Sequence, residues 1–268
     1  MTKKRPEPDF VEAFARGLKV INAFSLSHLT LTVSDVAAAT NLARPTTRRL
    51  LITLETLGYV RSHNGAYSLT PKVLELGTAY IAAQGLWDIA RPHLESLVAV
   101  THESSSMSQL DGSDIVYTAR VAVPKIIGIS VQIGTRFPAY ATSMGRVLLA
   151  DLSNAEVDRL LETPSQSGIV PRIKLSKRDL HASLTEIRKR GWAISDEQLS
   201  FGIRSVAAPV VNAEGRTIAA VNVTTNAAET SLSDLKRLHL PRLLKVAEAI
   251  SADWKRLELL PVSNLPLK

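Results

Sequence analysis

Apolar residues recur at the spacing of an α-helix through the first part of the chain and predict three helices, over residues 10–24, 33–41 and 45–57. Thr32 and Asp35 stand at the positions of a capping box before the second helix. Asn41 suits the end of that helix, because asparagine tolerates the left-handed conformation. Pro45 suits the first position of the third helix, where its missing N–H costs no hydrogen bond. The short turn between the second and third helices predicts a helix-turn-helix.

The stretch after the third helix predicts a β-hairpin of residues 59–61 and 66–69, with a turn at 62–65, and therefore a winged helix. The side chains of the third helix expected to pack inward are Thr47, Leu50, Leu51, Leu54 and Leu57. Arg48 and Arg49 are expected on the outer face, as in a recognition helix that enters the major groove. The alternative is that these arginines only solvate a surface helix. The residues expected to contact DNA are Arg44, Thr46, Thr47, Arg48, Arg49, Arg61 and His63.

Residues 71–87 are expected to form a linker helix between two domains, 10–70 and 88–258. In the second domain the pattern predicts strands over residues 105–110, 115–121, 126–133, 192–195, 204–211 and 217–224. Helices are predicted over residues 88–101, 143–149, 154–161, 177–190 and 232–257. Antiparallel hairpins with helices grouped between them predict an α+β domain with its helices on one face of the sheet. Residues 1–9 are expected to form a disordered tail and residues 259–268 a second tail.

The positive charge of the chain is concentrated at its amino-terminal end. The 268 residues include 32 Lys and Arg against 25 Asp and Glu, a net charge of +7. Residues 1–70 hold nine Lys and Arg and five Asp and Glu, so this short segment carries more than half of the excess. Such an asymmetry fits a module that binds nucleic acid.

Composition excludes several classes of protein. No uncharged stretch reaches the length of about 18–20 residues that a membrane span needs, and Leu76–Trp87, a stretch of apolar character, has only 12, so no membrane partner is expected. The absence of cysteine excludes disulfides and thiolate chemistry, and no apolar segment follows the basic first residues, so the expected location is cytoplasmic. The motifs of serine hydrolases, P-loop proteins, dinucleotide folds and zinc proteases are absent, and the six histidines are scattered. The chain is therefore expected not to be an enzyme, with no catalytic residue, metal or cofactor.

Small polar residues mark a candidate binding site in the second domain. In residues 139–146 a strand or loop meets a helix start, where Thr142 or Ser143 can cap and free N–H groups can bind a carboxylate or phosphate. The alternative is a plain capped helix without a ligand. Asn222 and Thr224 share one face of a predicted strand, and Ser205 opens the neighbouring strand. If these faces turn toward the helix start, they form an apolar pocket for a small organic acid; if they face solvent, they have no such role.

Three stretches of the chain resemble a known family. They are LTVSDVAAATNLARPTTRRLLITLETLGYV (31–60), FPAYATSMGRVLLA (137–150) and GWAISDEQLSFGIRSVAAPV (191–210). With them, nearly the whole chain resembles the IclR family of bacterial transcription regulators. The second and third stretches are most similar to the branch that controls protocatechuate and 4-hydroxybenzoate catabolism, the β-ketoadipate pathway. The chain departs from the family at Gln198, where an acidic residue is usual, and at Asn41, where glycine is usual.

The resemblance implies a winged helix-turn-helix, a linker helix and a GAF/PAS-like effector domain. Members are typically homodimers, often dimers of dimers, on palindromic operators in double-stranded DNA. Carried over by position, the acid group of the effector meets the backbone N–H groups of Ser143 and Met144. The other implied contacts are Ser195, Ser205, Asn222 and Thr224, with Ile129 and Ile203 as apolar walls. Ser195 replaces an acid, and residues 222 and 224 replace serines, of the glyoxylate-responsive members, which disfavours glyoxylate and pyruvate as effectors.

The expected function is that of a sequence-specific DNA-binding transcriptional regulator. A small organic acid is expected to modulate its operator binding or its activity, and the resemblance favours protocatechuate, 4-hydroxybenzoate or β-ketoadipate. The alternative is a small-acid-binding protein or an enzyme that uses its amino-terminal module for protein contacts. A nucleophile placed beside a base would favour the enzyme, and the sequence shows no such pattern.

Overall fold

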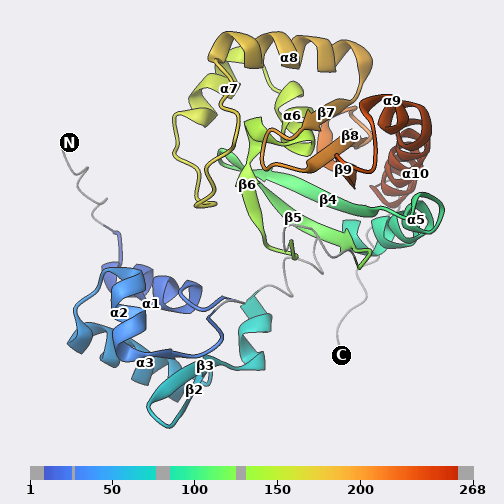
Figure 1. Ribbon diagram of the computed structural model, residues 1–268. Helices are drawn as coiled ribbons and strands as arrows, with labels where there is room; N and C mark the ends of the chain where they lie inside the picture. The colour runs from blue at the N-terminus through green and yellow to red at the C-terminus, as the bar shows by residue number, and fades with distance from the viewer. Residues whose placement is uncertain (1–8, 26–27, 77–84, 125–130, 259–268) are drawn as a thin grey trace. The chain divides into compact units, whose positions relative to one another are not determined.

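The computed structural model describes residues 9–25, 28–76, 85–124 and 131–258 (Figure 1). Contacts along the chain divide it into two compact units, Met1–Gln84 and Gly85–Lys268. Each unit has its own apolar core. Within the described ranges, no helix is long and apolar enough to cross a membrane.

The amino-terminal unit is a winged helix-turn-helix, as predicted. Its helices are α1 (Glu12–Asn22), α2 (Val33–Thr40) and α3 (Arg44–Thr56). Its strands are β1 (Leu31–Thr32), β2 (Val60–His63) and β3 (Ala66–Leu69), which form an antiparallel sheet in the order β1-β3-β2. Val20, Val36, Leu51 and Val60 bring the three helices and the hairpin onto one core. Leu57 is 52% exposed, so the expectation that it packs inward is wrong: α3 ends one residue before it.

The predicted caps of this unit are confirmed. The Thr32 side chain and the Asp35 carboxylate cap each other's backbone N–H groups at the start of α2, and Asn41 ends the helix at φ 54°. Asn64 and Gly65 both have positive φ, which suits a tight two-residue turn between β2 and β3. These local interactions hold α3 between the turn before it and the hairpin after it.

The middle of the expected linker helix lies outside the described residues. Pro71–Leu74 form a short 3₁₀ helix, η1, and residues 77–84 are not described. The next described helix, α5 (Leu86–Thr101), begins two residues before the predicted position.

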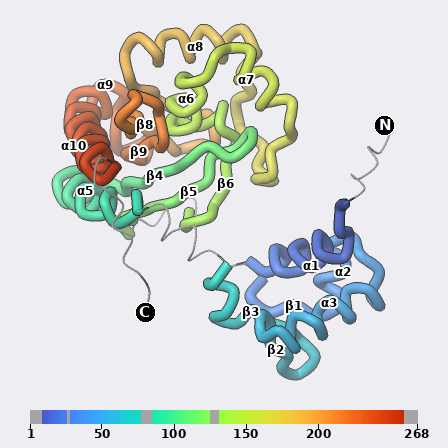
Figure 2. The backbone as a smooth tube through the Cα atoms, turned by 180° about the vertical axis from the view of Figure 1, so that it is seen from behind, coloured from blue at the N-terminus to red at the C-terminus, as the bar shows by residue number. Residues whose placement is uncertain are grey.

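The carboxy-terminal unit is built on an antiparallel sheet of six strands in the order β6-β5-β4-β9-β8-β7. Figure 2 shows β4, β5 and β6 of this sheet side by side from behind. The strands are β4 (Ser104–Asp111), β5 (Asp114–Val121), β6 (Arg136–Pro138), β7 (Ala193–Asp196), β8 (Ile203–Val211) and β9 (Thr217–Asn226). The helices after α5 are α6 (Ser143–Ala150), α7 (Asn154–Leu161), α8 (Lys177–Arg190), α9 (Leu232–Asp234) and α10 (Leu240–Glu258). The predicted bounds of α7 and α8 are confirmed. A π-helical turn, Leu235–His239, interrupts the single closing helix that the pattern predicts.

Helices cover both faces of this sheet, so the expectation of helices on one face is wrong. Val206 of β8 packs into a core with α5 and α10, whereas Ala207 faces the opposite side and packs into a core with α6 and α8. Buried residues therefore alternate between two apolar layers along the same strand, and each layer needs its own helices. Small residues such as Ala207 and Ala220 on the second face let α6 lie close to the strands.

The strand predicted over 126–133 is not observed where the structure describes it. Residues 125–130 lie outside the described ranges, and 131–133 are not extended in a sheet. The short strand β6 follows instead at Arg136–Pro138 and pairs with β5.

Candidate DNA-binding surface and effector cavity

The outer face of α3 carries cations that the rest of the unit leaves exposed. Arg44, Arg48 and Arg49 are exposed, and Thr46 is half-buried beside them. Thr47 is fully buried, and its hydroxyl donates to the backbone carbonyl of Ala43 at 3.2 Å. The expectation that Thr47 contacts DNA therefore does not fit the structure, because a side chain in the core cannot reach a base.

The wing is joined to α3 by a side-chain contact. The Glu55 carboxylate on α3 accepts hydrogen bonds from the backbone N–H of Ser62, at 3.0 Å, and from its hydroxyl, at 2.5 Å. Arg61 and His63, on either side of Ser62, are exposed near the tip of the hairpin. This contact holds the wing against the carboxy-terminal end of α3. The cations of α3 and those of the wing are therefore held in a fixed arrangement.

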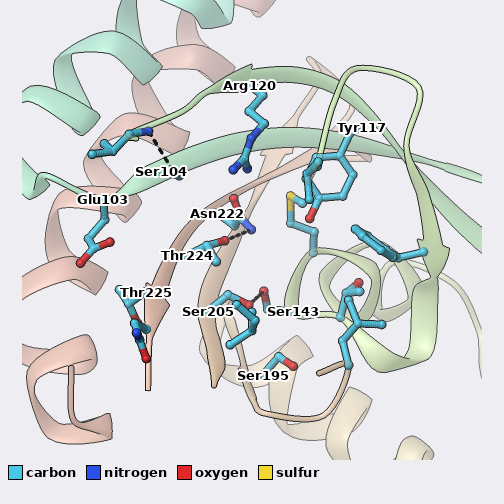
Figure 3. A pocket seen from close by; sticks show the side chains of 18 residues that line it. Glu103, Ser104, Tyr117, Arg120, Ser143, Ser195, Ser205, Asn222, Thr224 and Thr225 are labelled. Carbon is cyan, nitrogen blue, oxygen red and sulfur yellow. Dashed lines mark hydrogen bonds between the residues drawn. The ribbon is translucent and has the colours of Figure 1, made fainter. Parts of the chain in front are cut away.

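In the carboxy-terminal unit, α6 and the facing strands enclose a cavity of about 260 Å³, shown in Figure 3. Sites for drug-sized ligands measure about 300–1,000 Å³, so a cavity just below this range suits a molecule smaller than those. The predicted effector contacts that line the cavity are Ser143, Met144, Ser195, Ile203, Ser205, Asn222 and Thr224. Ile129, the remaining predicted wall, lies outside the described residues. The cavity residues not predicted from the sequence are Glu103, Ser104, Tyr117, Arg120, Val123, Val131, Phe137, Thr142, Leu199, Thr225 and Asn226.

One side of the cavity, at the start of α6, is lined by hydroxyl groups. The Ser143 and Ser205 hydroxyls are 2.7 Å apart and share a hydrogen bond (Figure 3). The Thr142 hydroxyl caps α6 by accepting the N–H of Gly145 at 2.9 Å. Ser195 of β7 is buried next to them and donates weakly to the Ala141 carbonyl at 3.4 Å. A ligand hydroxyl placed here can both donate and accept, because each serine does both.

The sheet presents an oriented amide on the floor of the cavity. The Oδ1 atom of Asn222 accepts the backbone N–H of Ser106 at 3.0 Å, and its Nδ2 donates to the Thr224 hydroxyl at 3.0 Å. Asn222 is almost fully buried. Both ends of the amide are thus held by neighbours, which leaves one N–H of Nδ2 to bind a ligand.

Arg120 brings a positive charge into the cavity because of an irregularity in β5. Tyr117 pairs with Ser108 and Ala119 pairs with Met107, so Thr118 is an extra residue in the ladder. Tyr117 and Arg120 are three residues apart and would face opposite sides of a regular strand. The bulge turns both toward the cavity, and the guanidinium group points toward Asn222 (Figure 3).

The charge on Arg120 is only partly balanced. Its Nη1 donates to the Ser106 hydroxyl at 2.9 Å. Burial lowers the pKa of its guanidinium, an effect that nearby Tyr117 partly offsets. Among the described residues no carboxylate forms an ion pair with Arg120. A half-buried cation whose partner among the described residues is a hydroxyl is suited to bind the carboxylate of a ligand.

Aromatic and sulfur-containing side chains form the remaining wall. The rings of Tyr117 and Phe137 meet edge to face, with centroids 5.6 Å apart. Burial raises the pKa of Tyr117 to about 12, so its phenol is neutral at physiological pH. Met144 is buried beside them and accepts a hydrogen bond from Ser108 at its sulfur atom. This wall suits a flat, apolar ring.

The described residues provide no obvious metal site. Within those ranges, no three His, Asp or Glu side chains come close enough together to hold a metal ion.

Comparison with known proteins gives matches over both units. A model of the IclR helix-turn-helix domain matches residues 13–63, and a model of the bacterial transcriptional regulator IclR C-terminal domain matches residues 78–252. The Pca regulon regulatory protein of Pseudomonas putida is 38% identical over 239 residues, which cover 89% of this chain and 82% of that protein. The p-hydroxybenzoate hydroxylase transcriptional activator of Acinetobacter baylyi is 31% identical over 219 residues, covering 80% of this chain and 81% of that protein.

The fold also matches solved structures. A crystal structure described as that of a transcriptional regulator from Rhodococcus sp. RHA1 is 46% identical in sequence, with a TM-score of 0.80. The match includes 92% of the residues of this chain and 100% of the residues of the Rhodococcus chain. The similarity therefore extends over both units.

Proposed function

The chain belongs to the IclR family of bacterial transcriptional regulators, and from this premise we propose that an aromatic hydroxy acid in the α6 cavity modulates its binding to an operator. The observation that carries the proposal is the combination of Arg120, an apolar wall and a cluster of hydroxyls around one small cavity. A hydroxybenzoate has the matching groups: a carboxylate, a flat ring and a phenol. The chain acts in this proposal by binding alone, without a catalytic step, cofactor or metal.

We place the effector with its carboxylate on Arg120 and its hydroxyls on Ser143 and Ser205. The resemblance to the family implies the reverse, with the acid on the backbone N–H groups of Ser143 and Met144. A guanidinium group carries a full charge, whereas a helix start offers about half a charge, so Arg120 is the stronger anchor. Protocatechuate and 4-hydroxybenzoate both fit this orientation. β-Ketoadipate has a carboxylate for Arg120 but no aromatic ring for the apolar wall. The names of the Pseudomonas and Acinetobacter relatives support the same class of effector.

On the DNA side, α3 enters the major groove and the wing contacts the backbone. The proposed contacts of the helix are Arg44, Thr46, Arg48 and Arg49, and those of the wing are Arg61 and His63. A homodimer places two such surfaces on a palindromic operator, and two dimers can occupy a pair of operators. The chain then works in the cytoplasm, where bacterial DNA is found.

Replacement of Arg49 by alanine tests the DNA half of the proposal. If Arg49 binds a guanine, Arg49→Ala weakens operator binding by about 1–3 kcal/mol and relaxes the preference at one base pair. Binding is measured by fluorescence anisotropy over a range of salt concentrations, because counterion release makes the affinity fall steeply with salt. Arg16→Ala is the control, since Arg16 lies on α1 in an exposed pair with Glu12. An equal loss on every DNA sequence would show that Arg49 contacts phosphate.

Thermal unfolding with candidate acids tests the effector half. We expect protocatechuate or 4-hydroxybenzoate to raise the melting temperature at millimolar concentration, with β-ketoadipate, pyruvate and glyoxylate as comparisons. A ligand at about 100 times its Kd adds about 2.7 kcal/mol of stability, which is readily measured. Replacing Asn222 with a bulky residue should abolish the shift by filling the floor of the cavity. If none of the five acids shifts the transition, the aromatic-acid assignment fails.

A further inference from the structure

The exposed face of α3 is divided into a charged half and an apolar half. Arg48 and Arg49 occupy the first half. The second half carries Ile52, which is 45% exposed, together with Thr53 and Thr56. The fold does not require an apolar side chain at position 52, because the core beneath α3 is formed by Leu51, Leu54 and their neighbours.

The two threonines extend the apolar half. The Thr53 hydroxyl donates to the Arg49 carbonyl at 2.9 Å, and the Thr56 hydroxyl donates to the Ile52 carbonyl at 2.9 Å. Both hydroxyls are thus turned back onto the helix, which leaves the methyl groups as the outward part of each side chain. The acid of this helix, Glu55, is bonded to Ser62 of the wing. The second half of α3, beyond the arginines, therefore presents methyl groups to any molecule that contacts this face of the helix.

We propose that Ile52 determines operator specificity by packing against the C5 methyl group of a thymine. This inference rests on the proposed function, in which α3 lies in the major groove. Thymine is the base that presents a methyl group in that groove, and apolar side chains recognise it by contact. Ile52 lies one helical turn beyond Arg48, about 6 Å along the axis, and base pairs are about 3.4 Å apart. The thymine should therefore lie within about two base pairs of the base that Arg48 contacts.

Deoxyuridine substitution tests the contact directly, because deoxyuridine is thymidine without that methyl group. The full-length wild-type chain first selects an operator from random double-stranded DNA. Each thymine of one half-site is then replaced singly by deoxyuridine, and Kd is measured for wild type and Ile52→Ala. Wild type should lose about fourfold in affinity at one thymine, the change expected when about one methyl-sized group is no longer buried. Ile52→Ala should show no loss at that thymine and keep the wild-type response at every other one.

Two further variants separate a specific contact from a general effect. Ile52→Val keeps β-branched methyl groups and should retain sensitivity at the same thymine. Leu57→Ala removes a similarly exposed side chain just beyond the end of α3 and should leave the whole deoxyuridine profile unchanged. The inference is overturned if wild type is insensitive at every thymine, or if Ile52→Ala keeps the complete wild-type profile. Failure of wild type to select any operator would instead refute the proposed function on which the inference rests.

Discussion

Gly145→Ala is expected to destabilise the carboxy-terminal unit by about 3 kcal/mol, although alanine is the better helix former. Gly145 lies in the first turn of α6, and a Cβ atom there would overlap the backbone of Ala139. Ala139 is fully buried, and its N–H donates to the Ser113 carbonyl at 3.0 Å, so this backbone cannot move aside easily. The start of α6, with Ser143, must shift instead. We therefore expect both lower stability and weaker effector binding.

Tryptophan fluorescence provides the measurement, because Trp87, Trp192 and Trp254 all lie in the carboxy-terminal unit. A loss of about 3 kcal/mol should lower its melting temperature by about 6–12 °C. Gly17→Ala is the matched control, a helical glycine whose added Cβ would meet nothing within 4 Å. Far-UV circular dichroism should show that control to be as stable as wild type or slightly more stable. If Gly145→Ala has the same melting temperature as wild type, α6 is not packed as closely against Ala139 as described.

The features best predicted from the sequence are those set by neighbours in the chain. The capping box of Thr32 and Asp35 and the left-handed Asn41 involve contacts within a few residues, and each residue type has a specific physical reason for its place. Alternation along β9 likewise places Asn222 and Thr224 on one face without knowledge of the partner strand. Which face meets α6 depends on tertiary packing, and the structure supplies that information.

Arg120 shows why the rest of the cavity could not be predicted. Regular alternation from Ile115 places residue 120 on the face away from the cavity, and the extra residue Thr118 reverses that phase. A bulge of this kind depends on how β4 and β5 pair, and no single residue type predicts it. Thr47 illustrates a different difficulty: helical spacing correctly indicates the core, while its position beside the arginines suggests a DNA contact. Burial decides between the two.

Arg120→Met is expected to weaken the binding of protocatechuate and 4-hydroxybenzoate by about tenfold to a hundredfold, while the empty protein stays folded. A hydrogen bond to a charged group contributes about 1.5–3 kcal/mol, and methionine keeps the apolar stem while removing the charge. The empty variant should be at least as stable as wild type, because a half-buried cation that pairs with no carboxylate of the described residues costs desolvation energy. Titration calorimetry gives Kd, and Arg237→Met, an exposed residue outside the cavity, is the control.

Comparison with catechol, which lacks the carboxylate of protocatechuate, identifies the anchor. Wild type should bind protocatechuate far more tightly than catechol. In Arg120→Met this preference should largely disappear, because the carboxylate has lost its cationic partner and both molecules are held by their hydroxyls at Ser143 and Ser205. If the variant keeps the full preference for the acid, the carboxylate lies elsewhere in the cavity. The remaining anchor would then be the N–H groups of Ser143 and Met144, and the effector would bind in the reverse orientation with its hydroxyls toward β5.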